Sequence, residues 1–128
     1  MISALEAFTA PGDYVLLHSP CYIGFTNSIK NAGRNIIYSN LIQDENGVWR
    51  MDYQDMDQKI KQHKIHFVVF CSPHNPCGRV WTKEELTKAM EVYKQNDCIV
   101  VSDEIWSDII LDDHKHIPLQ SINDDAKK

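Results

Sequence analysis

The apolar positions of this chain switch repeatedly between two spacings. Short runs of continuous apolar residues around Val15, Val68 and Val100 predict buried strands, whereas a spacing of three or four positions in the intervening segments predicts helices. We expect helical segments at residues 2–9, 24–32, 53–62 and 82–95, and strands at residues 14–18, 35–40, 66–71 and 99–102. Gly33 suits a helix C-terminus, residues 44–47 suit a turn, and Thr82 with Glu85 reads as a capping box.

Strands that are apolar on both faces are typical of a parallel sheet between helix layers. The pattern therefore predicts an α/β fold, a three-layer α/β/α arrangement with a mainly parallel sheet. Right-handed crossovers place the carboxyl ends of such strands on one edge. We expect residues 20–22, 75–78 and 103–106 to gather there. Because the polar stretch 123–128 adds no strand, we interpret residues 1–128 as one incomplete domain, a fragment of a larger protein.

Composition narrows the class of protein. The net charge of −5 and the pI near 5.6 argue against binding nucleic acid. No apolar run has the length of a membrane-spanning helix, so we expect no membrane partner and a cytoplasmic location. Cys71, His74 and Cys77 could be read as metal ligands, but no second set of ligands accompanies them. We expect buried free thiols and no metal.

Polar side chains follow the predicted strands at the shared edge. Asp103 could keep a bound pyridine nitrogen protonated, Asn75 could donate to a ring oxygen, and Tyr22 could stack on the ring. Each residue also has a simpler interpretation. Asp103 could cap a helix, Asn75 could shape a proline-rich turn, and Tyr22 could pack at a helix start. Their order and spacing together favour a site.

Four ordered motifs resemble one enzyme superfamily. Residues 72–78 read S-P-H-N-P-C-G and residues 102–105 read S-D-E-I, preceded by P-G-D at 11–13 and P-C-Y at 20–22. These resemble the motifs of class I/II aminotransferases, which depend on pyridoxal 5'-phosphate (PLP) and share fold type I. The stretch G-R-V-W-T at 78–82 is similar to the bacterial cystathionine β-lyase (C–S lyase) branch, and H-I-P after the S-D-E-I motif agrees with it.

The resemblance implies a role for four residues in binding PLP. Tyr22 would stack on the ring, Asn75 would bond its 3-oxygen, and Asp103 would pair with its nitrogen. Trp106 stands where many members of the family have tyrosine and the lyase branch often has histidine. Because indole donates a hydrogen bond but cannot accept one, a proton relay at Trp106 is in doubt.

The resemblance also implies what residues 1–128 lack. They would form the central part of the PLP-binding large domain, between the phosphate-binding loop and the strand that bears the Schiff-base lysine. Lys127 and Lys128 lie in a polar tail and do not suit that role. The parent protein would be a PLP-dependent homodimer acting on an amino-acid substrate, either by β-elimination as a C–S lyase or by transamination. We expect the isolated chain to be inactive.

Two other classes of protein remain open on the sequence. Residues 99–104 resemble the strand of a nucleotide hydrolase that carries an Asp-Glu pair, but no G-x-x-x-x-G-K-[ST] loop is present to hold the phosphates. The chain could also be a non-catalytic module that only folds or binds a partner. Magnesium-dependent nucleotide binding would favour the first class, and a monomeric domain without ligand would favour the second.

Overall fold

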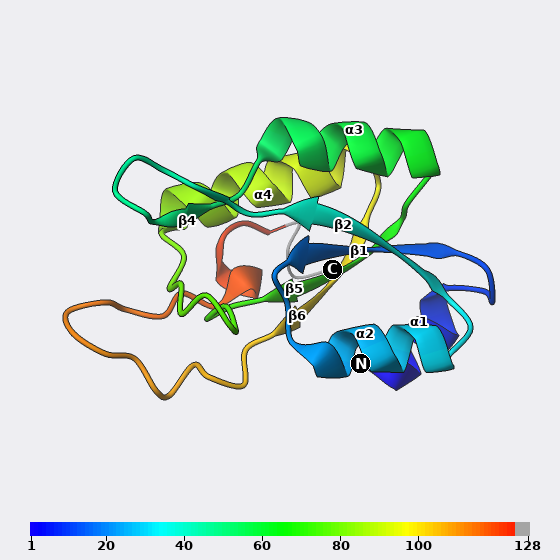
Figure 1. The fold of residues 1–128 in the computed structure, drawn as a ribbon, viewed down its shortest axis with the longest axis horizontal. Helices are drawn as coiled ribbons and strands as arrows, with labels where there is room; N and C mark the ends of the chain where they lie inside the picture. The colour runs from blue at the N-terminus through cyan, green and yellow to red at the C-terminus, as the bar shows by residue number, and fades with distance from the viewer. Residues whose placement is uncertain (125–128) are drawn as a thin grey trace.

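The structure, a computed structural model, describes residues 1–124 and has a four-stranded parallel sheet at its centre (Figure 1). The strand order is β2-β1-β5-β6, with every neighbouring pair parallel. The sheet strands are β1 (Tyr14–Ser19), β2 (Asn35–Asn40), β5 (Phe67–Cys71) and β6 (Ile99–Asp103). The α-helices are α1 (Ile2–Phe8), α2 (Ile23–Asn31), α3 (Tyr53–His63) and α4 (Lys83–Gln95).

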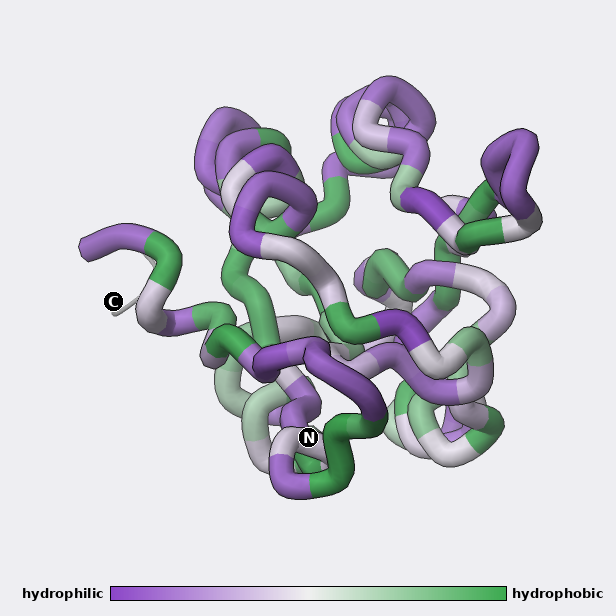
Figure 2. Tube along the Cα trace, turned by 90° about the vertical axis from the view of Figure 1, so that its left-hand side faces the viewer, coloured by the Kyte–Doolittle hydropathy of each residue, from purple (hydrophilic) through white to green (hydrophobic). Residues whose placement is uncertain are grey.

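Helices cover both faces of the sheet. Figure 1 shows α3 and α4 on one side and α1 and α2 on the other. Alternate strand residues enter two separate cores: Leu16 packs in the cluster that includes Met56 of α3, and Val15 packs in the cluster that includes Ile29 of α2. The predicted three-layer architecture and parallel sheet are therefore confirmed. Figure 2 shows apolar stretches in the middle of the molecule and hydrophilic outer turns on α3 and α4, the helices at the top of the view.

Element boundaries differ from the sequence prediction by one or two residues. β6 continues to Asp103, and β5 begins at Phe67, although the carbonyl of His66 still accepts a hydrogen bond from Ile99 N at 2.8 Å. α3 continues to His63 and ends at Lys64, whose φ of 52° is left-handed. Polar residues at these ends carry little periodic signal. Pairing between β5 and β6 sets the ends of the two strands, and the left-handed backbone of Lys64 ends α3.

The hairpin of β3 (Ile42–Gln43) and β4 (Trp49–Arg50) and the 3₁₀ helix η1 (Leu119–Ser121) were missed by the pattern analysis. Elements of two or three residues are too short to show a period. The turn predicted at 44–47 is confirmed, since Asp44 closes it by accepting from Asn46 N and Val48 N. Lys127 and Lys128 lie outside the described residues. Within residues 1–124, no helix is both long and apolar enough to cross a membrane.

The predicted capping box at the start of α4 is confirmed. Thr82 Oγ1 accepts from Glu85 N at 3.2 Å, and Glu85 Oε2 accepts from Thr82 N at 2.9 Å. Replacing Thr82 with alanine should lower the free energy of unfolding by about 1 kcal/mol, because a helix-terminal N–H loses its acceptor. Thr87→Ala is the control, since the Thr87 hydroxyl only donates to a carbonyl of its own helix on an exposed face. If urea denaturation gives Thr82→Ala and Thr87→Ala the same loss of unfolding free energy, the prediction is contradicted.

Candidate functional site

The carboxyl ends of three strands surround a small hollow. It has a volume of about 210 Å³, and its lining consists of Tyr22, Phe25, Cys71, Asn75, Asp103, Ile105 and Trp106. This cavity is called the rim hollow below. All four residues singled out in the sequence line it, so the predicted gathering of their segments is confirmed. Their roles toward a cofactor stay a prediction.

Tyr22 lies where β1 gives way to α2. It is the N-cap residue of α2, with extended backbone, and its ring lies edge-on to Phe25 at a centroid distance of 5.6 Å. Half of Tyr22 is exposed. The ring crosses the first turn of α2 at Gly24, where an added Cβ would lie 2.2 Å from Tyr22 Cε1. The residue thus packs at the helix start, as its simpler interpretation holds, and still lines the rim hollow.

Asn75 sits in a tight turn between β5 and α4. His74 N donates to Arg79 O at 2.8 Å, and Gly78 N donates to His74 O at 2.8 Å. Gly78 has a φ of 66°, a conformation that glycine adopts without strain. Trp81 Nε1 donates to Cys71 O at 3.0 Å and holds the returning chain against β5. Asn75 both shapes this turn and faces the rim hollow.

Asp103 is the last residue of β6 and is paired in register with Cys71 of β5. Its carbonyl accepts from Ser72 N at 2.9 Å, and its Oδ1 accepts from Ile105 N at 3.1 Å. Turns follow Asp103, and no helix begins there. The interpretation of Asp103 as a helix cap is therefore wrong, because its carboxylate caps only a local turn and borders the hollow.

Trp106 belongs to a loop, residues 104–118, that is anchored by Glu104. The Glu104 carboxylate accepts from Ser102 Oγ at 2.8 Å and from Leu119 N at 2.9 Å, and it pairs with His116 Nε2 at 2.8 Å. Burial raises the pKa of Glu104, but these hydrogen bonds outweigh it and lower the pKa overall. The carboxylate therefore stays charged and fixes both ends of the loop.

A second hollow lies between this loop and the turn that bears Asn75. Its volume is about 460 Å³, and it shares Asn75 and Trp106 with the rim hollow. Ile109 and Leu111 border it and are largely exposed. The side chains of Asn75 and Trp106 are consequently placed to contact ligands in either cavity.

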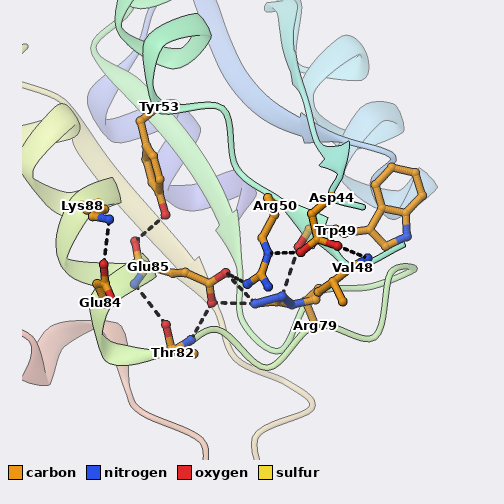
Figure 3. A network of polar contacts seen from close by, with 10 residues as sticks. All are labelled: Asp44, Val48, Trp49, Arg50, Tyr53, Arg79, Thr82, Glu84, Glu85 and Lys88. Atoms are coloured by element: carbon orange, nitrogen blue, oxygen red, sulfur yellow. Dashed lines mark hydrogen bonds and ion pairs between the residues drawn. The ribbon is translucent and has the colours of Figure 1, made fainter. Parts of the chain in front are cut away.

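Glu85 of α4 is hydrogen-bonded to Arg79, the residue whose carbonyl closes the Asn75 turn (Figure 3). Arg79 Nη2 donates to both carboxylate oxygens of Glu85, to Oε1 at 2.6 Å and to Oε2 at 2.5 Å. Arg50 Nη1 donates a third hydrogen bond to Oε1 at 2.9 Å. Arg79 Nη1 also donates to Trp49 O at 3.1 Å, and its guanidinium lies 4.8 Å from the centroid of the Trp81 ring. The turn, the β3–β4 hairpin and α4 are joined at one carboxylate.

The cysteine and histidine side chains near the hollow form no metal centre. Among residues 1–124, no group of three histidine, cysteine or acidic side chains is placed to hold a metal ion. Cys71 Sγ donates to Pro73 O at 3.3 Å, and burial raises the pKa of its thiol to about 11. Cys71 is therefore a protonated, apolar part of the cavity wall at neutral pH.

Three residues that line the rim hollow were not recognised in the sequence. Phe25, Cys71 and Ile105 are apolar residues inside or beside regular elements. In the sequence, Cys71 was considered only as a metal ligand and Ile105 only as part of the S-D-E-I motif. Glu104 was noted as part of a motif without a role. Its anchoring function depends on His116 and Leu119, twelve and fifteen positions away. No local signal predicts such contacts.

Comparison with known proteins places these motifs in a family. The profile described as aminotransferase class I and II matches residues 1–127. The chain is 38% identical over 122 residues to cystathionine beta-lyase PatB from Bacillus subtilis (strain 168), covering 95% of this chain and 31% of that protein. It is 36% identical over 121 residues to an alanine aminotransferase from Mycobacterium bovis, covering 94% of this chain and 28% of that protein.

Solved structures agree with the sequence comparison. Cystalysin from Treponema denticola, whose crystal structure contains a pyridoxal 5'-phosphate cofactor, superposes with a TM-score of 0.92 at 38% sequence identity. The match covers 98% of this chain and 32% of cystalysin. The chain thus spans about a third of the length of the relatives it matches. Its four-stranded sheet corresponds to a portion of such an enzyme.

Proposed function

Because the chain belongs to the aminotransferase class I and II family, we propose that it forms the central part of the PLP-binding large domain of an enzyme that acts on amino acids. The proposed reaction is β-elimination by a C–S lyase similar to cystathionine β-lyase. The observation that carries the proposal is the rim hollow, where Tyr22, Asn75, Asp103 and Trp106 meet at the carboxyl edge of the parallel sheet. The similarity to PatB supports the lyase.

The residues around the rim hollow fit the ring of PLP. The lining combines an aromatic ring, an amide, a carboxylate and an indole N–H, which are the groups that hold a charged heterocycle. Within the described residues, this lining includes no lysine or arginine. We therefore propose that residues 1–128 by themselves hold the ring but complete no reaction, since a Schiff-base lysine is needed for covalent catalysis.

Each residue would act on the bound ring in a distinct way. The carboxylate of Asp103 keeps the ring nitrogen protonated through a charge-assisted hydrogen bond. When bound, the cofactor supplies an electron sink for the bonds at the substrate α-carbon. Asn75 donates to the ring oxygen, and Tyr22 covers the ring face and excludes water. The indole N–H of Trp106 can donate to the same oxygen but takes up no proton.

A class I/II aminotransferase is the second candidate. The identity to an alanine aminotransferase is 36%, close to that of the lyase. Ring-holding residues serve both reactions, because both begin with loss of the substrate α-proton. The motif at residues 78–82 favours the lyase. Analysis of the products formed by the whole protein separates the two reactions. A C–S lyase releases pyruvate and ammonia, whereas an aminotransferase forms a new amino acid.

We also propose that the whole protein is a homodimer located in the cytoplasm. Ile105, Ile109 and Leu111 of the loop at residues 104–118 are more than half exposed, beside the half-exposed Tyr22. Such a row of apolar side chains around a site is typical of a surface that a partner covers. None of the four cysteines is in a disulfide, which agrees with a reducing compartment.

A PLP titration followed by absorbance tests the ring site. Wild-type chain should give a saturable signal, and Asp103→Asn should weaken binding about tenfold, because the amide cannot hold the ring nitrogen in its charged form. The asparagine Oδ1 can still accept from Ile105 N, so the local turn is kept. Glu45→Gln is the control, since it makes the same chemical change at an exposed position of the β3–β4 turn.

Either of two results would count against the proposal. The first is a titration of the wild-type chain without saturation. The second is an Asp103→Asn variant that binds PLP as well as Glu45→Gln does, which would mean that the carboxylate does not face the ring nitrogen.

A further inference from the structure

The segment of residues 105–115, which carries Trp106, is held mainly at its ends. Within the described part of the chain, its hydrogen bonds go only to Asp103, to Glu104 and to itself. Ile109 and Leu111 are largely exposed, so packing holds the segment weakly. Its course over the site is therefore set where it leaves β6 and where it returns to the body of the chain.

The return of the segment is fixed by one histidine. His116 Nε2 lies 2.8 Å from Glu104 Oε2, and the His116 side chain is only 11% exposed. Because a carboxylate only accepts hydrogen bonds, Nε2 carries a proton and donates it. The buried Nδ1 of His116 has no hydrogen-bond partner within residues 1–124. The Glu104 carboxylate is thus the one acceptor that orients this ring in the described structure.

The same carboxylate is bonded on both sides of the segment. Its Oε1 accepts from Ser102 Oγ of β6 at 2.8 Å and from Leu119 N, at the start of η1, at 2.9 Å. The backbone carbonyl of Glu104 accepts from Ser107 N at 2.9 Å, which closes the turn that contains Trp106. One residue therefore joins the strand, the returning chain and the Trp106 turn, and a displacement of the returning chain reaches Trp106 through Glu104.

We propose that His116, acting through Glu104, is a positioning residue that fixes Trp106 between the rim hollow and the second hollow. The proposal rests on the proposed PLP site for its meaning, since the Trp106 N–H would reach the ring oxygen there, but not for its test. A histidine that only filled space beside η1 would be replaceable by any ring of similar size. A positioning histidine needs a donor at Nε2, which the amide of glutamine supplies and phenylalanine does not.

Nitrogen-15 NMR of the Trp106 indole N–H tests the proposal without a ligand, and Trp106→Phe identifies the signal by its loss. In His116→Phe the signal should move to the position of a freely exposed indole. Amide exchange at Leu119 should become about tenfold faster, because the carboxylate that accepts from its N–H loses a charge-assisted hydrogen bond. His116→Gln should return both readouts to the wild-type values.

His114→Phe is the matched control, because it makes the same change at an exposed position of the same loop. It should leave the Trp106 signal and the Leu119 exchange rate unchanged. A wild-type Trp106 signal in His116→Phe would overturn the proposal. So would an equal displacement of the signal in His116→Gln, since a role in packing alone does not distinguish a donor from an apolar ring.

A second measurement uses the unmodified chain and does not depend on a variant of His116 folding. Nitrogen-15 relaxation should show the Trp106 indole as rigid as that of Trp81, whose Nε1 donates to Cys71 O at 3.0 Å in the core. The His116 ring should carry a proton on Nε2. A Trp106 indole more mobile than that of Trp81, or a His116 proton on Nδ1 alone, would overturn the proposal.

PLP binding separates this proposal from the proposed function. Where the wild-type chain binds PLP, His116→Phe should weaken binding about fivefold, the contribution of one hydrogen bond to the ring, and His116→Gln should not. Absence of PLP binding in the wild type would contradict the proposed function. The Trp106 signal would then still decide whether His116 positions the indole.

Discussion

Lowering the pH from 7 to 4.5 should destabilise the chain, by on the order of 2 kcal/mol for each buried histidine. Burial lowers the pKa of His18 from its usual 6.5 to about 3, with a further decrease from His74 and a small opposing effect of Asp55. Burial likewise lowers the pKa of His74 to about 4. Both rings are therefore neutral in the folded chain across this range.

The direction of this change in stability follows from proton binding. Below pH 6.5 the unfolded chain protonates these histidines and the folded chain does not, so protons favour unfolding. The stabilising contribution is fully present above pH 6.5 and is lost as the pH falls toward 4 for His74 and 3 for His18. The carboxylates of Glu85 and Glu104 have a lowered pKa in the folded chain. Their contribution to the free energy of unfolding is therefore lost only below pH 4.5, the usual pKa of a glutamate. The interval from pH 6.5 to 4.5 thus reports mainly on the histidines.

Urea denaturation at several pH values measures this dependence. His74→Gln should reduce the slope by about half, because one of the two buried titrating rings is gone. His66→Gln, at an exposed position, serves as the matched control and should keep the wild-type slope. A slope in His74→Gln equal to that of the control would show that the buried pair does not govern the acid sensitivity.

Replacing Glu85 with glutamine should destabilise the chain by about 2–3 kcal/mol. The side chains of Glu85 and Arg79 are each only 12% exposed, so removing the carboxylate leaves a largely buried guanidinium without its charge partner. Arg50 loses the same carboxylate, although it keeps Asp44 at 2.9 Å. The loss is greater than that of a surface ion pair because water cannot readily replace the missing acceptor.

The neighbouring Glu84 provides a matched control. It forms an exposed ion pair with Lys88 at 2.7 Å, one turn along the same helix (Figure 3). Glu84→Gln should change the free energy of unfolding far less than Glu85→Gln does, because water screens and replaces an exposed ion pair. The two variants differ only in burial and partner number, so similar losses in urea denaturation would refute the structural role assigned to Glu85. The Asn75 turn should also exchange its amide protons faster in Glu85→Gln only.

The helix caps and strands show how much of the fold a local pattern can predict. Continuous apolar runs around Val15, Val68 and Val100 predicted a parallel sheet buried on both faces, and the structure confirms the parallel sheet and the burial of β1 and β5. For the strand around Val100 the predicted burial is wrong, because β6 lies at the edge of the sheet and is only partly buried. The Thr82 cap was predictable because its partner Glu85 lies three residues away. The β3–β4 hairpin was missed because each strand has two residues, and its stability comes from distant contacts such as Arg50 with Glu85.

The sequence by itself determined the α/β class and the parallel sheet. It also determined that Tyr22, Asn75, Asp103 and Trp106 meet, because right-handed crossovers place the carboxyl ends of parallel strands on one edge of the sheet. Only the tertiary structure decided which side chains support them. Nothing local distinguishes buried His74 from exposed His66, or Glu85 from Glu84. Burial and pairing are set by elements far apart in the chain, and they determine which groups stay neutral, which stay charged and which hold the site in place.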